Sequence, residues 1–238
     1  MKRILILLIA GITIVISTER AQAQAALFIL IFGDKVASEN FHLSLDIGLN
    51  AAKMSGFDDG KSLIGLNFGL GTHIKINDRW YLAPEFKPLS PKGARDVANP
   101  IDLDEQFEVD ETNSKIKLNY IEVPLLVQYR LPAGWYFSAG PQLSFLTSAK
   151  QETEIILTSG TLVDVEQDLK DNFKSFDWSI PVEVGYAFKE KRGGKGIDLR
   201  LRYTYGFNDV FESGTDLSAN HSTFQFILTF PFVEVAEE

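Results

Sequence analysis

A strict alternation of apolar and polar side chains runs through most of the chain after Asn40, and it restricts the possible folds more than any other feature. Successive side chains of a β-strand point to opposite sides, so a repeat of two residues indicates strands with one apolar face. The clearest case is 176–188, where seven large apolar residues alternate with polar or small ones. The same pattern occurs at 41–50, 64–76, 80–89, 120–129, 135–145, 197–207 and 223–232.

The lengths of these eight segments favour strands that cross a membrane. Most span ten or more residues, whereas strands of soluble domains are usually about five or six long, and a tilted membrane-spanning strand needs about 9–11. The connections between them alternate between long and short: 51–62, 77–79, 90–114, 131–134, 150–173, 189–196 and 208–221. We therefore expect an all-β protein with an eight-stranded antiparallel up-and-down transmembrane β-barrel over residues 40–232. Short periplasmic turns and long outer loops are typical of such barrels, so both termini are expected in the periplasm and the long loops outside the cell.

The direction of the apolar face follows from its volume. An eight-stranded barrel has an interior just wide enough for side chains to fill it, and the many aromatic side chains of this face would crowd it. The opposite face is rich in Gly, Ser and Asn, so we expect the apolar face to contact lipid. Aromatic residues gather near strand ends, as in the girdle of an outer-membrane barrel. The predicted girdle residues are Trp80, Tyr81, Trp135, Tyr136, Tyr203, Tyr205, Phe230 and Phe232.

Residues 1–25 are typical of a signal peptide. Two basic residues precede the apolar segment 4–16, and small residues allow cleavage after Ala23 or Ala25. The apolar segment is shorter than the roughly 20 residues that a membrane-spanning helix needs. A second apolar run begins at Ala26, so later cleavage near Ala37 stays open, and 26–39 is treated as a separate N-terminal segment. The chain ends in an acidic tail, 233–238.

Composition excludes several functions. The net charge of −9 leaves no basic surface for a nucleic acid, and the absence of cysteine excludes disulfides, thiolate metal sites and a cysteine nucleophile. We expect neither a metal nor a cofactor.

Charged residues on the polar face are expected to point into the barrel. A packed network in which opposite charges pair is favoured, because an unpaired buried charge is expensive. Such a network would plug the barrel against bulk solute flow. A proton path, a selectivity filter or a catalytic carboxylate pair are the functional alternatives. The predicted network consists of Asp46, Glu85, Glu122, Arg130, Glu183, Asp198, Arg200 and Arg202.

Other polar candidates give weaker signals. His221 and Ser222 are adjacent and would point to opposite faces of a strand, which argues against a catalytic pair. His42 and His73 are expected to line the polar face. The long loops are acidic and could bind divalent cations, which prefer carboxylate oxygen, although no EF-hand spacing is present.

One stretch of sequence resembles a known family. YIEVPLLVQYR at 120–130, followed by WYFSAGP at 135–141, is similar to the PorT-type outer-membrane β-barrel family of Bacteroidetes. APEF at 83–86 and PKGA at 91–94 resemble the family's third strand and the following loop. The resemblance implies the fold over about 40–232 and suggests a role in a protein-secretion apparatus. The acidic tail departs from the family's frequent terminal aromatic residue.

Three functions are therefore considered. The favoured one is a non-enzymatic structural or interaction barrel of the cell envelope, in contact with outer-membrane lipid and with envelope or secretion-complex proteins. A narrow porin-like channel and an outer-membrane lipid-modifying enzyme are the alternatives.

Overall fold

The computed structural model describes residues 40–56, 60–97, 109–157, 162–188, 196–212 and 218–232. The predicted signal peptide, the segment 26–39 and the acidic tail 233–238 lie outside these residues. The described elements are β1 (Phe41–Met54), β2 (Lys61–Lys75), β3 (Trp80–Val97), β4 (Val109–Arg130), β5 (Trp135–Ala139), β6 (Gln142–Leu157), β7 (Leu162–Asp168), a 3-10 turn (Lys170–Asn172), β8 (Phe176–Phe188), β9 (Ile197–Gly206) and β10 (His221–Phe232). Within this part of the chain, no helix has the length and apolar character to cross a membrane.

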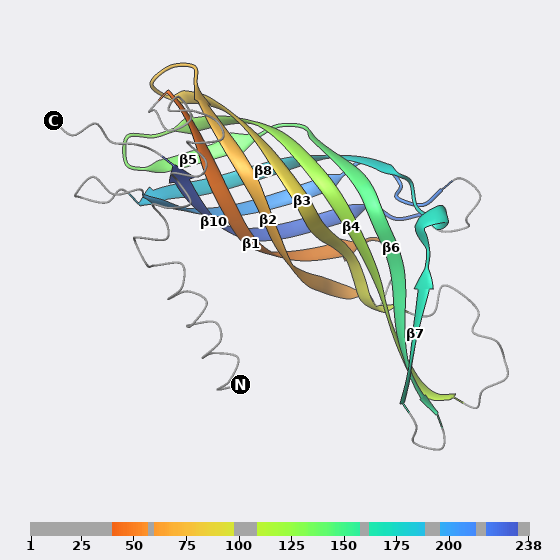
Figure 1. Ribbon diagram of the computed structural model, residues 1–238. Coiled ribbons are helices and arrows are strands. Elements are labelled where there is room, and N and C mark those ends of the chain that lie inside the picture. Colours follow the sequence, from red (N-terminus) through yellow and green to blue (C-terminus); the bar gives the residue numbers. More distant parts are fainter. Residues whose placement is uncertain are drawn as a thin grey trace, which may run out of the picture.

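The strands close into a ring. All pairings are antiparallel, and β1 pairs both with β2 and with β10, where Leu43 lies opposite Phe232. β5 and β6 together occupy one position between β4 and β8, so eight strand positions complete the ring (Figure 1). The predicted eight-stranded antiparallel up-and-down architecture is confirmed.

The predicted fifth strand is divided at Gly140. A Cβ at this position would lie 2.0 Å from the carbonyl oxygen of Leu125 on β4. Glycine therefore permits the close backbone approach at which the Leu125 N–H donates to the carbonyl of Pro141, at 2.9 Å. As a result both β5 and β6 pair with β4.

Apolar side chains cover the outside of the ring and polar ones fill it. On β9, Leu201 and Tyr203 are 39% and 44% exposed, whereas Arg200 and Arg202, which alternate with them along the strand, are buried. The same alternation holds on the other ring strands, so the outer surface is a continuous apolar band suited to lipid.

The strands continue further than the sequence pattern predicted at one end of the ring. β3 reaches Val97 and β4 begins at Val109, inside the expected loop 90–114, and β7 lies inside the expected loop 150–173. Figure 1 shows β4, β6 and β7 leaving the barrel as long twisted ribbons. We call the part formed by β3 from Pro91, β4 up to Asn119, β6 from Ser148 and β7 the projecting sheet.

The apolar face changes sides where the projecting sheet begins. Along β4, Val123 and Ile121 point outward, but Tyr120, Leu118 and Ile116 are fully buried inside. The alternating outward positions then become polar. This inversion is expected where a barrel wall passes from lipid into water, because the interior becomes the only place to bury apolar surface.

Closure of the ring predicts heat-modifiable migration on gels. Unboiled protein in detergent is expected to migrate faster than boiled protein, because the compact ring unfolds only on heating. Gly140→Val would push a side chain into the Leu125 carbonyl, and we expect it to reduce the fast-migrating fraction strongly after refolding. Ala139→Val adds volume to an exposed neighbouring position and serves as the control. Equal behaviour of the two variants would contradict the close approach.

Candidate functional site: the barrel interior and its projecting sheet

The centre of the barrel holds a compact charge network built around two arginines of β9. Arg200 and Arg202 both point inward because they are two residues apart on one strand. The Arg202 guanidinium donates to Glu85 at 2.6 Å and to Glu183 at 2.6 Å. Arg200 donates to Glu85 at 2.6 Å and lies 2.5 Å from Asp46. These contacts join β1, β3, β8 and β9 across the interior.

A lysine of β3 completes this central network. Lys87 is fully buried, with its Nζ 3.7 Å from a Glu85 carboxylate oxygen and 3.1 Å from the Gln225 side-chain oxygen. Three cations, Lys87 and the two arginines, thus face three carboxylates, Asp46, Glu85 and Glu183. The formal charges balance, which is the condition under which buried ions are tolerated.

A second polar group lies between the central network and the projecting sheet. Lys92 Nζ is 2.9 Å from Glu122 and 3.4 Å from Asp177, and it also donates to Ser144 at 3.3 Å. Its ammonium stands 4.7 Å from the ring centre of Tyr120. Glu122 was predicted to face the interior. Lys92 and Asp177 were not among the predicted network residues; Lys92 fell in a segment expected to be a loop.

The third polar group lines the opposite mouth of the barrel. The Arg130 guanidinium stacks 4.2 Å from the ring centre of Tyr81, and its Nε donates to Gln128 at 2.7 Å. The Tyr136 hydroxyl donates to Asp198 at 3.0 Å. Arg130 and Asp198 therefore belong to this mouth, outside the central network. Arg130, Tyr81 and Tyr136 also line a pocket of about 320 Å³.

The predicted aromatic girdle is wrong for two residues, Tyr81 and Tyr136. Tyr136 is fully buried, its ring occupying space that a Cβ at Gly185 would enter, and Tyr81 also faces the inside of the mouth. Trp80–Tyr81 and Trp135–Tyr136 are adjacent pairs, and only one member of such a pair can face lipid. The structure places the remaining predicted residues on the outer face: Trp80, Trp135, Tyr203, Tyr205, Phe230 and Phe232.

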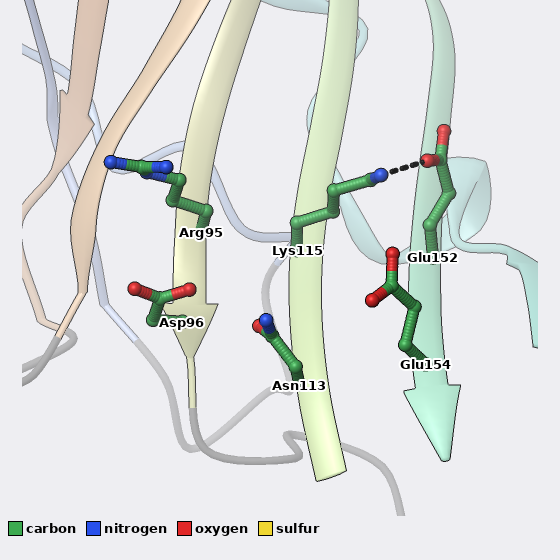
Figure 2. Close-up of a pocket in the computed structure, with 6 residues that line it drawn as sticks. All are labelled: Arg95, Asp96, Asn113, Lys115, Glu152 and Glu154. Atoms are coloured by element: carbon green, nitrogen blue, oxygen red, sulfur yellow. Dashed lines mark ion pairs between the residues drawn. The ribbon is translucent and has the colours of Figure 1, made fainter. Parts of the chain in front are cut away.

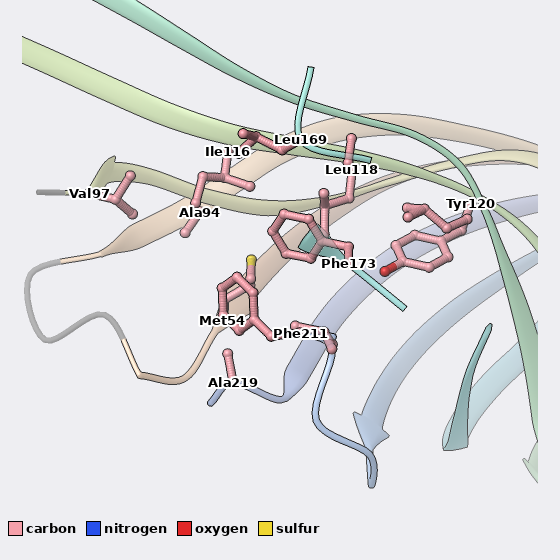
Figure 3. Packing of buried hydrophobic residues seen from close by; sticks show 13 residues of the cluster. Met54, Ala94, Val97, Ile116, Leu118, Tyr120, Leu169, Phe173, Phe211 and Ala219 are labelled. Carbon is pink, nitrogen blue, oxygen red and sulfur yellow. The ribbon is translucent and has the colours of Figure 1, made fainter. Parts of the chain in front are cut away.

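A hydrophobic cluster closes the barrel at the projecting end. Phe173 and Phe211 stack with ring centres 4.8 Å apart, and Met54 lies beside them (Figure 3). They pack between the strand ends and the segments that follow β7 and β9. The cluster contains Met54, Ala94, Val97, Ile116, Leu118, Tyr120, Leu146, Ala149, Leu169, Phe173, Val210, Phe211 and Ala219. We call it the hydrophobic cap.

The histidines occupy separate interior positions. His42 and His73 stack with ring centres 4.7 Å apart on neighbouring strands. His221 accepts or donates a hydrogen bond at 3.2 Å with the Tyr120 hydroxyl beneath the cap. Among the described residues, no cluster of three or more His, Asp or Glu is arranged to hold a metal ion.

The outer face of the projecting sheet carries alternating cations and carboxylates. Lys115 Nζ lies 2.7 Å from Glu152, and this hydrogen bond holds the pKa of the Glu152 carboxyl below its ordinary value. In Figure 2, Arg95, Lys115 and Glu152 lie at one level of the sheet, and Glu154 lies nearer to the strand ends. Together with Asp96 and Asn113 they line a shallow pocket of about 160 Å³.

Charge balance in the central network predicts a large effect of Arg202→Met. The change would leave Glu85 and Glu183 with one guanidinium fewer, and we expect unfolding in urea from micelles to become about 3–5 kcal/mol easier. Arg79→Met, at the rim where its guanidinium meets the Tyr129 hydroxyl, should change the unfolding free energy by about 0.5 kcal/mol or less. Adding Glu183→Gln to Arg202→Met restores neutrality and should recover part of the loss. Similar losses for the two single arginine variants would contradict the network.

Several solved barrels resemble this structure at low sequence identity. Neisserial surface protein A matches with a TM-score of 0.40 and 13% identity, covering 81% of this chain and 97% of that one. Ail, the attachment invasion locus protein of Yersinia pestis, matches with a TM-score of 0.40 and 13% identity, covering 82% and 99%. OprG of Pseudomonas aeruginosa matches with a TM-score of 0.39 and 11% identity, covering 83% and 98%.

The family of the chain follows from its sequence and not from these structural likenesses. No curated protein matches the chain. The profile of the family described as "Outer membrane protein beta-barrel domain" matches residues 21–212, which is most of the chain. The protein therefore belongs to the outer-membrane β-barrel domain family, and its place is the outer membrane.

Proposed function

We propose that this protein is a closed structural barrel that anchors a rigid β-sheet at the cell surface for contact with other envelope proteins. The observation that carries the proposal is the filling of the interior at successive levels. Four groups of side chains follow one another along the barrel axis. They are the mouth with Arg130 and Tyr81, the central charge network, the polar group around Lys92, and the hydrophobic cap. An interior filled in this way favours anchoring over solute transport.

The projecting sheet supplies a surface for protein contact. β7 pairs with β6 along one edge, from Lys150 opposite Asp168 to Ile156 opposite Leu162. No described strand pairs with its other edge. An exposed strand edge can accept a further strand from a partner through main-chain hydrogen bonds. The resemblance to PorT-type barrels suggests that such a partner belongs to a secretion assembly, which is an analogy at the level of family.

The geometry around the histidines argues against the lipid-modifying alternative. His221 is buried and bonded to Tyr120, whereas Ser222 lies on the opposite side of β10. A hydroxyl nucleophile requires its base within hydrogen-bond reach, and these two side chains point apart.

A filled interior predicts electrical silence. Wild-type protein inserted into planar bilayers is expected to give no discrete conductance steps. The double variant Glu85→Ser/Arg202→Ser removes two long side chains without changing the net charge of the interior, and it should raise the ion leak if the central network is the barrier. Discrete steps from the wild type would overturn the closed-barrel proposal and favour a channel.

The orientation can be tested with single cysteines, because the chain has none of its own. Gln167→Cys on β7 should react with a membrane-impermeant maleimide on intact cells. Asp78→Cys, in the turn between β2 and β3, should react only after the outer membrane is opened. Both side chains lie in exposed positions, so a difference in labelling reports the side of the membrane. The reverse result would place the projecting sheet in the periplasm and contradict the proposal.

A further inference from the structure

The strand β7 forms one margin of the projecting sheet and leaves main-chain groups unpaired along it. It stands at the end of the strand order, beside β6 (Figure 1). Within the described part of the chain, no other strand forms backbone hydrogen bonds with 162–168. About half of the N–H and C=O groups of such a strand point away from the sheet, where a further strand can pair with them.

The two faces of β7 differ in charge. Its outward face carries three carboxylates: Asp164, Glu166 and Asp168. The other face carries Val163 and Val165, and Val163 lies opposite the buried Ile155 of β6. β7 contains no lysine or arginine, and the next cation along the chain is Lys170 of the following 3-10 turn. The edge is therefore acidic on one side and apolar on the other.

Carboxylates of β6 add to the negative charge beside β7. Glu152 lies opposite Glu166, and Glu154 lies opposite Asp164. Like charges directly opposite each other on antiparallel strands destabilise a sheet. Additional cations at this edge would therefore be stabilising.

Cations of the chain neutralise this edge only in part. Lys115 Nζ lies 2.7 Å from Glu152, and Lys150 Nζ lies 2.5 Å from Glu166. Among the described residues, the other carboxylates of this part of β6 and β7 form no ion pair: Glu154, Asp164 and Asp168.

The remaining cations of the outward face lie too far away to change this. Arg95 is on β3, three strand positions from β7. Neighbouring strands are about 4.8 Å apart, which gives about 14 Å. Exposed charges at that separation are largely screened at physiological ionic strength, where the Debye length is about 8 Å. The negative charge is thus concentrated at the β7 side of the sheet.

The chain itself shows which kind of strand pairs with an edge of this type. β4 pairs with the other edge of β6, and at 115–118 it alternates lysine with isoleucine and leucine. The two lysines approach Glu152 on the outward side, and the apolar side chains are buried on the inner side. A strand of the same pattern beside β7 would place cations next to its carboxylates and apolar residues next to its valines.

Charge disfavours two other occupants of the edge. In a two-fold antiparallel pairing with β7 of a second copy, centred on Val165, Asp164 would lie opposite Glu166, and such like-charge pairs are unfavourable. The segment 98–108 of this chain has four carboxylates and no basic residue. A complementary strand is therefore expected from a different protein.

We propose that β7 binds an extended segment of a partner protein in which lysine or arginine alternates with apolar residues. Main-chain hydrogen bonds to the free edge would supply affinity, and the alternating side chains would supply specificity. The inference rests on the proposed function, because it names the chemistry of the partner that the projecting sheet contacts.

Binding of short peptides tests the edge. The mature protein, refolded in a zwitterionic detergent, is titrated into a fluorescent seven-residue peptide of alternating lysine and valine, and anisotropy reports binding. A glutamate–valine peptide reverses the charge, and a lysine–proline peptide keeps the charge but lacks half of the main-chain donors. Only the lysine–valine peptide should bind strongly, and it should slow hydrogen exchange of the β7 amides, because pairing protects them.

Matched variants test the carboxylates of β7. Asp164→Asn/Asp168→Asn should weaken binding of the lysine–valine peptide roughly fivefold, or about 1 kcal/mol, because two cross-strand charge pairs are lost. Asparagine at 168 keeps a side-chain oxygen to accept the Lys170 N–H, now at 2.9 Å. Asp78→Asn/Asp171→Asn removes the same charge from exposed positions outside β7 and should bind like the wild type.

A stability measurement separates binding from folding. Without peptide, Asp164→Asn/Asp168→Asn should unfold in urea no more easily than the wild type, because it relieves the repulsion between Glu154 and Asp164. Equal binding of the three peptides, unchanged exchange of the β7 amides, or equal losses in the two double variants would each overturn the inference and leave the closed barrel intact. Discrete conductance steps would overturn the closed barrel without altering peptide binding.

Discussion

Backbone hydrogen bonding in hydrocarbon is the constraint on which the rest of this structure depends. A β-strand in lipid must pair on both edges, because no water is present to satisfy its N–H and C=O groups. Pairing of β1 with β10 meets this requirement by closing the ring at eight strand positions. A ring of that size encloses a space that side chains fill. Charged residues on its inner face must then pair with one another, as Arg202 does with Glu85 and Glu183.

Much of this arrangement could be predicted from the period of two. Alternation identifies the strand positions and assigns Glu85, Glu183 and Arg202 to one face, since parity is a local property of the chain. It does not give the contacts among them. Glu85 and Arg202 are on β3 and β9, which are not neighbours in the ring, and they meet only because long side chains reach across the interior. Such partners depend on how strand tilt and stagger set the level of each residue in the barrel.

The projecting sheet was missed for a different reason. In the sequence Lys115-Ile116-Lys117-Leu118-Asn119-Tyr120 the period of two persists, but the apolar residues take the even positions, whereas beyond Ile121 they take the odd ones. Treating polar residues as the sign of a loop ended the strand too early. An exchange of faces without a break in the period is itself a signal, because it is expected where one continuous strand leaves the membrane. The signal does not extend to Lys92 of β3, because a register shift between Lys87 and Ser90 reverses the parity of that strand before Lys92 pairs with Leu118 of β4.

The same exchange connects the interior to the surface of the molecule. Where the wall leaves lipid, the apolar side chains lie inside and form the cap, and charged residues occupy the outward positions. The cap and the charged outward face of the projecting sheet are therefore two consequences of one boundary, on opposite sides of the same strands. The lysine at 117 points out because the isoleucine at 116 and the leucine at 118 point in. A cap stabilised by burial holds the strands in register, and that register places Arg95 opposite Lys115 and Lys117 opposite Lys150. The repulsion between these cations is thus offset by the packing beneath them and by the carboxylates of β6 and β7 on the same face, such as Glu152 and Glu166.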